Sequence, residues 1–246
     1  MPEGPSIVIL KEQAAQFARR RILRVEGNSS VIDQSRLLNK RIVSVRSWGK
    51  HFLIELPGFS LRVHFMLFGS YRINERKDRP PRLSLGFTRG DELNLYACSV
   101  RYIDGGLDQT YDWSGDVMSD DWDAAAARKK LRARPDKLVC DALLDQTIFA
   151  GVGNIIKNEV LFRIRVHPLS TIGQLPAAKL RALVTEARQY SFDFMAWKKA
   201  YVLKKNWLAH AKRICPRCDL PYTKAHLGLT PRRSFFCTNC QKLYAA

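Results

Sequence analysis

The sequence contains no long apolar run. Every apolar stretch falls well short of the roughly 20 residues that a membrane-spanning helix needs. The N-terminus also lacks the basic-then-apolar order of a secretory signal peptide. We therefore expect a soluble, cytoplasmic protein that has no membrane partner.

Acidic residues are scarce. The chain has 23 Asp and Glu residues against 41 Lys and Arg residues, which gives a formal net charge of +18. Such an excess says little about the fold, but it favours a polyanionic partner, most often nucleic acid. A basic ribosomal protein or a membrane-surface protein would share it. From Lys198 onward Asp219 is the only acid, so we expect the C-terminal part to face phosphates.

Cysteines are few, and most of them are clustered. Of six cysteines, four form two Cys-x-x-Cys pairs near the C-terminus: Cys215, Cys218, Cys237 and Cys240. The 18 residues between the pairs, 219–236, match the spacing of a four-cysteine zinc site. Because four thiolates leave no open position for water, the pattern predicts one structural Zn²⁺ rather than a catalytic one.

The hydrophobic pattern changes near the middle of the chain. Short runs rich in branched residues between 22 and 97, among them 60–65 and 70–73 as separate strands, predict an antiparallel β-sandwich behind a helix over 6–20. Helical patterns then cover residues 121–131, 138–146, 154–162, 176–195 and 202–209. We therefore predict an α+β multidomain protein. Its parts are a β-sandwich domain (1–121), a helix and linker (122–136), a helical domain (137–210) and a zinc finger (211–246).

The first residues, Met1-Pro2-Glu3-Gly4, offer a possible nucleophile. Removal of Met1 would give Pro2 a free secondary amine, and a terminal amine titrates near about pH 8. Such an amine can attack an electrophilic carbon as a Schiff-base lysine does, with Glu3 moving the proton. The alternative is a frayed chain end without function, which is the commoner case.

Several motifs occur in a specific order along nearly the whole chain. They are Met1-Pro2-Glu3-Gly4-Pro5, Trp48-Gly49-Lys50-His51, the stretch from Leu143 through Gly151-Val152-Gly153-Asn154 to Asn158-Glu159, His167-Pro168, and the cysteine finger. This ordered set resembles the formamidopyrimidine-DNA glycosylase and endonuclease VIII family of base-excision repair. The resemblance implies a two-sheet antiparallel β-sandwich with a leading helix. A helical domain with a helix-two-turns-helix motif and a zinc-finger β-hairpin would follow.

The resemblance also implies roles for individual residues. Pro2 matches the amine that attacks C1′ of the damaged nucleotide, and Glu3 matches the general acid that acts on the sugar. Lys50 matches a hairpin lysine that contacts phosphate and assists proton transfer, although it could be a phosphate clamp only. Asn154 and Arg232 match residues that grip phosphates. From its own sequence, the turn at Gly151–Asn154 fits a phosphate site and a plain helix-to-helix turn equally well.

The segment from His64 to Gly69 resembles the endonuclease VIII branch. In that branch an apolar pair before the glycine fills the gap left by a flipped base, and apolar wedges between bases are a general device. Met66, Leu67 and Phe68 are the matching DNA-contacting residues. The Asp-Pro-Arg-Arg-Phe-Gly run of the purine-directed branch is missing. We therefore expect oxidised pyrimidines as substrates, with a purine-directed enzyme as the alternative.

Together the resemblance implies a bifunctional DNA glycosylase and abasic-site lyase that cleaves the strand by β,δ-elimination. It would act as a monomer on damaged duplex DNA, without a soluble cofactor, and it would be nucleoid-associated if bacterial. The main alternative is a non-catalytic DNA-binding protein with the same fold. A basic zinc-ribbon RNA-binding protein would require the Pro2-Glu3 start to be a coincidence.

Overall fold

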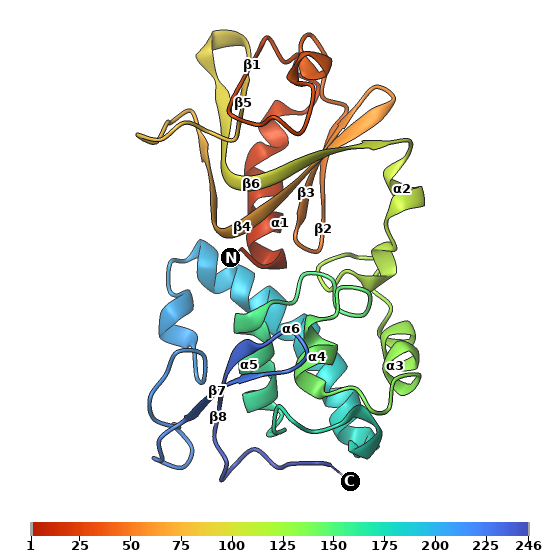
Figure 1. Ribbon diagram of the computed structural model, residues 1–246, viewed down its shortest axis with the longest axis vertical. Coiled ribbons are helices and arrows are strands. Elements are labelled where there is room, and N and C mark those ends of the chain that lie inside the picture. Colours follow the sequence, from red (N-terminus) through yellow and green to blue (C-terminus); the bar gives the residue numbers. More distant parts are fainter. Residues whose placement is uncertain (1, 246) are drawn as a thin grey trace. The chain divides into compact units, whose positions relative to one another are not determined.

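The computed structural model describes residues 2–245. The chain divides into two compact units, Met1–Asp112 and Trp113–Ala246 (Figure 1). Each unit has its own hydrophobic core. Met1, whose removal is part of the expected chemistry, lies outside the described residues.

The first unit opens with the helix α1, Gly4–Ala14, which continues into a single 3₁₀ turn, η1, Ala15–Phe17. A proline in the first turn favours this start, because its missing N–H has no partner to lose there. Ile7, Leu10 and Phe17 are buried on one side of the helix and belong to the core of the unit. The predicted helix is confirmed, but it begins two residues earlier and ends before the arginines that follow it.

Six antiparallel strands form one continuous sheet in the order β1-β5-β6-β4-β3-β2. Their bounds are β1 Arg24–Glu26, β2 Ser44–Trp48, β3 His51–Leu56, β4 Phe59–Ile73, β5 Leu83–Gly86 and β6 Glu92–Asp104. Short helical turns lie between them at η2 Gln34–Leu37 and η3 Thr88–Gly90, and α2 Leu107–Thr110 follows β6. The segments 60–65 and 70–73, expected as two strands, are the two halves of β4.

A bulge separates these two halves. Phe65 pairs with Cys98 and Ser70 pairs with Tyr96, so residues 66–69 stand opposite Ala97 alone. Ala97 takes a left-handed conformation with φ 47°. A bulge bends its strand and re-aims the side chains on it.

Because of the bulge, two halves of a single sheet form the two layers of the predicted sandwich. On one side of it β4 pairs with β3, and on the other side β6 pairs with β5. Side chains from both halves, such as Leu61 and Leu85, meet in the same core together with α1. The expected antiparallel fold is confirmed, and its two layers belong to one hydrogen-bonded ladder.

The second unit is mainly helical. Its elements are η4 Trp113–Gly115, α3 Ala124–Arg132, α4 Val139–Leu144, α5 Asn154–Arg163, η5 Ile172–Gln174, α6 Ala177–Lys199, η6 Leu203–Asn206, β7 Thr223–Leu227 and β8 Arg232–Phe236. The Asp123 carboxylate accepts hydrogen bonds from the backbone N–H groups of Ala125 and Ala126, which sets the start of α3. Within residues 2–245, no helix is both long enough and apolar enough to span a membrane.

Two successive turns join α4 to α5, as the resemblance implied. They are closed by backbone bonds from Ile148 N to Asp145 O (3.0 Å) and from Val152 N to Phe149 O (3.1 Å). The Gln146 side chain spans both turns: its Nε2 donates to the Val152 carbonyl, and its Oε1 accepts from Gly151 N. The stretch from Leu143 to Asn154 is therefore a self-contained helix-two-turns-helix connection.

The helix predicted over 202–209 is wrong beyond Asn206. Trp207 is extended, with φ −70° and ψ 130°. The next three amides, from Leu208 to His210, donate to the buried Glu159 carboxylate at 2.7–3.1 Å. Because these N–H groups bind a side chain of α5, they are not available to continue a helix.

Gly69→Ala tests the bulge. An added Cβ would lie 2.6 Å from the Phe65 Cβ and 2.9 Å from the Ala97 carbonyl oxygen, closer than real Cβ contacts allow. We expect a loss of about 1–3 kcal/mol in the free energy of unfolding, as for overpacked cores, measured by chemical denaturation. Gly106→Ala is the matched control, because nothing lies within 4 Å of its added Cβ. Equal stability of the two variants would contradict this account.

Candidate active site

Residues 2–5 are packed into the first unit. Glu3 is the N-cap of α1 in an extended conformation, and its carbonyl accepts the Ser6 N–H at 2.8 Å. Gly4 and Pro5 are buried, and the Glu3 side chain is only 3% exposed. Pro2 is half-buried beside it. A buried carboxylate therefore lies next to the nitrogen that processing would convert into an amine.

Lys50 lies in the turn between β2 and β3. Trp48 pairs with His51 across a two-residue loop, and Gly49 has φ 52°. Two-residue hairpins of this kind require positive φ at the first loop position, which glycine adopts without strain. The Lys50 side chain is half-buried. Because α1 packs against both β2 and β3, the hairpin that presents Lys50 is attached to the helix that Glu3 caps.

Two histidines, His51 and His64, lie close to Lys50. The His51 and His64 rings meet edge to face at 5.3 Å, and His51 Nδ1 is 3.1 Å from the Tyr111 hydroxyl. Burial, together with the charge of Arg62, lowers the pKa of His51 to about 4. Burial and the neighbouring Lys50 and Arg62 also lower the pKa of His64. Both rings are therefore neutral at neutral pH.

His51 and Tyr111 were not identified as site residues from the sequence. His51 stands next to Lys50 in the hairpin motif, so its position was a usable signal. Tyr111 is 60 residues away from His51, and no local pattern links the two. His64 has a hydrogen bond to the Lys50 backbone, while its Nδ1 is buried and has no hydrogen-bond partner among the described residues.

The predicted apolar wedge occupies the β4 bulge. Met66, Leu67 and Phe68 are 54%, 61% and 77% exposed. They are held in place by the paired residues on either side, Phe65 and Ser70. Three neighbouring apolar side chains in water are unfavourable unless a partner covers them. The bulge therefore presents an apolar surface on an ordered strand.

Asn154 and Arg232 belong to the second unit, where the structure brings their elements together. Asn154 begins α5, and its Nδ2 donates to the Arg233 carbonyl at 3.0 Å. Asn158, one turn later, donates to the same carbonyl at 3.3 Å and accepts from Phe235 N. Arg232 is exposed at the start of β8. The helix end and the finger arginines thus form one surface.

A buried lysine adds to this junction. Lys157 is fully buried, and its Nζ donates to the Ser234 hydroxyl at 2.8 Å. Lys157 and Asn158 follow Asn154 on α5, and sequence reasoning gave neither of them a role. Their spacing from Asn154, three and four residues on a helix, was the available signal.

Asp141 of α4 holds the turn of the finger hairpin. Its two carboxylate oxygens accept the Leu229 N–H at 3.0 and 3.1 Å. Gly228 has φ 92°, and a Cβ there would lie 2.2 Å from the carboxylate. The turn that leads to Arg232 is therefore fixed to the helical part of the unit. Asp141 was not recognised from the sequence.

The four finger cysteines lie together. Their sulfur atoms are all within 4.8 Å of one another, and Cys215 Sγ and Cys240 Sγ are 3.7 Å apart. Tetrahedral Zn–S bonds of about 2.3 Å would set neighbouring sulfurs roughly 3.8 Å apart. The cluster therefore has the donor set and the dimensions of a structural zinc site. Asn239 Nδ2 donates to Cys218 Sγ at 3.2 Å, a hydrogen bond from within the finger to one of the four sulfurs.

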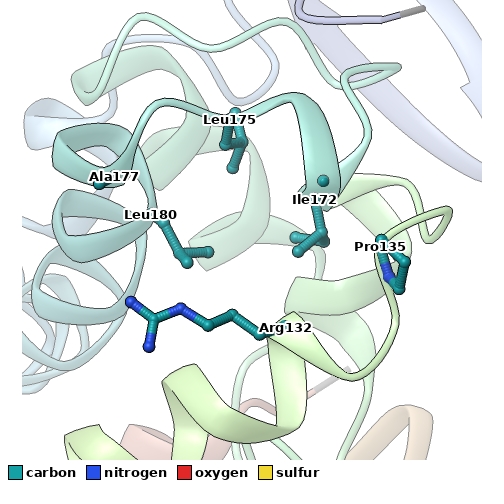
Figure 2. A pocket seen from close by; sticks show the side chains of 7 residues that line it. Arg132, Pro135, Ile172, Leu175, Ala177 and Leu180 are labelled. Carbon is teal, nitrogen blue, oxygen red and sulfur yellow. The ribbon is translucent and has the colours of Figure 1, made fainter.

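A separate pocket of about 220 Å³ lies elsewhere in the second unit. Figure 2 shows its apolar lining and the Arg132 side chain along its edge; the lining residues are Arg132, Pro135, Ile172, Gly173, Leu175, Ala177 and Leu180. None of the predicted site residues lines this pocket.

Comparison with known proteins gives two family matches. Residues 1–101 match the formamidopyrimidine-DNA glycosylase N-terminal domain, and residues 114–190 match the formamidopyrimidine-DNA glycosylase H2TH domain. Endonuclease 8 2 of Mycobacterium bovis is 30% identical over 265 residues, covering 98% of this chain and all of the relative. Endonuclease 8-like 3 of Mus musculus is 31% identical over 217 residues, covering 84% of this chain. The chain spans only 36–39% of the length of the vertebrate Endonuclease 8-like 3 proteins.

Solved structures share the fold. A viral DNA glycosylase superposes with a TM-score of 0.83 at 19% identity, covering 98% of this chain and 100% of that one. The Lactococcus lactis formamidopyrimidine-DNA glycosylase, solved with DNA that contains an abasic site, gives a TM-score of 0.84 at 22% identity. It covers 98% of this chain and 99% of that one.

Asp141→Ala tests the fixed finger turn. Loss of the carboxylate leaves the Leu229 N–H without its acceptor, so we expect faster hydrogen exchange from Leu229 through Arg232. The zinc content should stay unchanged. Asp136→Ala, an exposed acid with the same charge, is the control. Unchanged exchange in Asp141→Ala would show that the turn is held in another way.

Proposed function

Because the chain belongs to the formamidopyrimidine-DNA glycosylase and endonuclease VIII family, we propose that it removes oxidised bases from DNA and cleaves the strand at the resulting abasic site. The observation that supports this most directly is the packed start of the chain. Pro2 and the buried Glu3 are held at the beginning of α1, next to the hairpin that presents Lys50.

The proposed reaction uses the Pro2 nitrogen as nucleophile once Met1 has been removed. Its lone pair attacks C1′ and the bond from C1′ to the base breaks. Glu3 protonates the ring oxygen as the sugar opens, which gives an iminium ion between Pro2 and C1′. The iminium acidifies the C2′ proton, so its loss expels the 3′ phosphate, and a second elimination expels the 5′ phosphate. Water then hydrolyses the iminium and restores the amine.

Glu3 is suited to this role by its surroundings. It directly follows Pro2 in the chain, and the residue is only 3% exposed, so bulk water has little access to its carboxyl group. Lys50 would contact a phosphate beside the lesion, and the neutral His51 and His64 add no further positive charge beside it at neutral pH.

DNA would be held by residues of both units. A base must leave the stack before its glycosidic bond can be reached, and Met66, Leu67 and Phe68 would fill the gap. Asn154 and Arg232 would grip phosphates, and the exposed Arg232 guanidinium fits bidentate contact. Zn²⁺ bound by the four cysteines would stabilise the hairpin and take no part in the reaction. We propose that the protein acts on duplex DNA as a monomer.

For the substrate we propose oxidised pyrimidines. The Leu67-Phe68 pair and the similarity to proteins named endonuclease 8 support this choice. The Lactococcus lactis glycosylase has been solved both with an oxidised pyrimidine and with an N7-benzyl-Fapy-dG lesion. Since one such protein takes both kinds of base, selectivity would depend on side chains at the lesion rather than on the fold.

Borohydride trapping tests the nucleophile. Protein beginning at Pro2, incubated with a duplex that contains an abasic site, should form a covalent adduct because borohydride reduces the iminium to a stable amine. The same protein with one residue retained before Pro2 should form none, since the nitrogen is then an amide. Mass spectrometry of the intact adduct and its N-terminal peptide is the measurement. Absence of an adduct with correctly processed protein would disprove the mechanism.

Glu3→Gln tests the acid. The variant keeps the shape of the side chain but cannot donate a proton from it, so excision of an oxidised pyrimidine should fall by roughly 10²–10⁴-fold. Cleavage at a preformed abasic site, which needs no base release, should partly survive. Single-turnover assays on the two substrates measure both steps. Unchanged excision would exclude Glu3 as the acid.

A further inference from the structure

Two short segments of the first unit, 19–23 and 39–43, face each other as an antiparallel pair. Backbone bonds run from Ile22 N to Lys40 O (2.8 Å) and from Ile42 N to Arg20 O (2.9 Å), with Arg21 directly opposite Arg41. Ile22 and Ile42 are buried in the core. Because side chains alternate along a strand, Arg21 and Arg41 point outward on the same face.

This outward face carries an unbalanced positive charge. Arg21 and Arg41 on this face are exposed, as are Arg19 and Lys40 in the same two segments, and we call these four residues the arginine ribbon. Among residues 2–245 none of the four forms an ion pair with a carboxylate. Asp91 instead pairs with the neighbouring Arg20 at 2.8 Å.

The facing side chains of Arg21 and Arg41 carry like charges that repel each other when no ligand is bound. Arg21 and Arg41 form a non-hydrogen-bonded antiparallel pair, in which Cα atoms are only about 4.5 Å apart. Like charges directly opposite each other destabilise a sheet. Arg19 has φ 65°, a conformation that glycine would adopt without strain. Arg21 Nη1 donates to the Asn39 carbonyl oxygen at 3.0 Å, a neutral acceptor that leaves the charges of the facing arginines unbalanced.

The ribbon lies at the end of α1 that is remote from Pro2. The 11 residues of α1 span about 16 Å, and the following 3₁₀ turn adds roughly 6 Å. Figure 1 shows β1, which follows the first ribbon segment, beyond the C-terminal end of α1. Phosphates beside a nucleotide at Pro2 are thus at the other end of the helix.

We propose that the arginine ribbon binds the phosphate backbone of a second DNA segment while the first segment occupies the site at Pro2. Paired guanidinium groups give phosphate oxygens bidentate hydrogen bonds, and bound phosphates would remove the repulsion between Arg21 and Arg41. This inference rests on the proposed function, because it concerns DNA other than the strand under repair. A protein that binds two DNA segments at once can transfer from one to the other without first dissociating into solution.

The test uses a protein whose site at Pro2 is already filled. A short duplex is first trapped covalently with borohydride, and the adduct is then titrated with a second, fluorescent, undamaged duplex at several salt concentrations. The wild-type adduct should bind the second duplex in a salt-dependent way. Arg21→Ala/Arg41→Ala should bind it roughly tenfold more weakly, and the slope of log K against log salt should fall by about two.

Lys129→Ala/Arg181→Ala is the matched control, because it removes two exposed cations from the second unit. It should bind the second duplex as the wild type does. Cleavage of the short duplex should be unchanged in both double variants. Equal binding by Arg21→Ala/Arg41→Ala and wild type would overturn the proposal. So would ribbon-dependent binding to phosphatidylserine vesicles or to polyglutamate that exceeds binding to the duplex.

Arg41→Glu separates a DNA-binding role from a structural one. The new carboxylate faces Arg21, so the melting temperature should equal or exceed that of the wild type, while affinity for the second duplex falls. A variant that keeps full affinity would overturn the proposal. If the wild type forms no adduct, the proposed function fails. The free protein is then titrated with the same undamaged duplex, and equal affinity of wild type and Arg21→Ala/Arg41→Ala would overturn the ribbon separately.

Discussion

The first unit depends on the burial of α1. Ile7 and Leu10, with Phe17 of the following turn, belong to the buried core of the unit, and each fully buried side chain of this kind contributes roughly 1.5–3 kcal/mol. This packing fixes a helix that begins at Gly4, and so it fixes the residues just before it. A chain end is normally the least ordered part of a domain. Here Glu3 is buried and its carbonyl accepts the Ser6 N–H, so the segment that would carry the amine in the proposed reaction is packed against the first unit.

The second unit solves a different problem, because the finger is too small to have much of a core. Its buried cluster consists of few residues, two of them cysteines. The metal would join the two cysteine pairs, while Asp141, Asn154 and Lys157 attach the hairpin to α4 and α5. These contacts involve backbone or hydroxyl groups of the hairpin, so they leave the Arg232 guanidinium available to a ligand. Asp141, Asn154 and Lys157 thus set the position of the finger hairpin, while Arg232 supplies its positive charge.

The sequence predicted features that are local along the chain. Two Cys-x-x-Cys pairs must form knuckles, so the cysteine cluster could be identified from spacing alone, whereas the hairpin at Lys50 was implied by the family resemblance. Contacts between distant segments could not be identified from spacing. Nothing near Glu159 indicates that its carboxylate will take the amides of residues 208–210 and end a helix. The bulge at 66–69 was interpreted as a break between two strands, because the pairing of Phe65 with Cys98 involves a strand about 30 residues away.

Burial decides which positive charges this protein carries. His51 and His210 have a pKa of about 4 because burial penalises the imidazolium, and nearby cations add to that effect. These rings therefore contribute packing and hydrogen bonds without charge at neutral pH. Arg21 and Arg41 remain in water, where their mutual repulsion is weakened but not abolished. Exposed cations cost little in water and are attracted strongly by phosphates, whereas buried cations without partners would destabilise the fold. The charge of +18 can thus be concentrated on surfaces that a polyanion can reach.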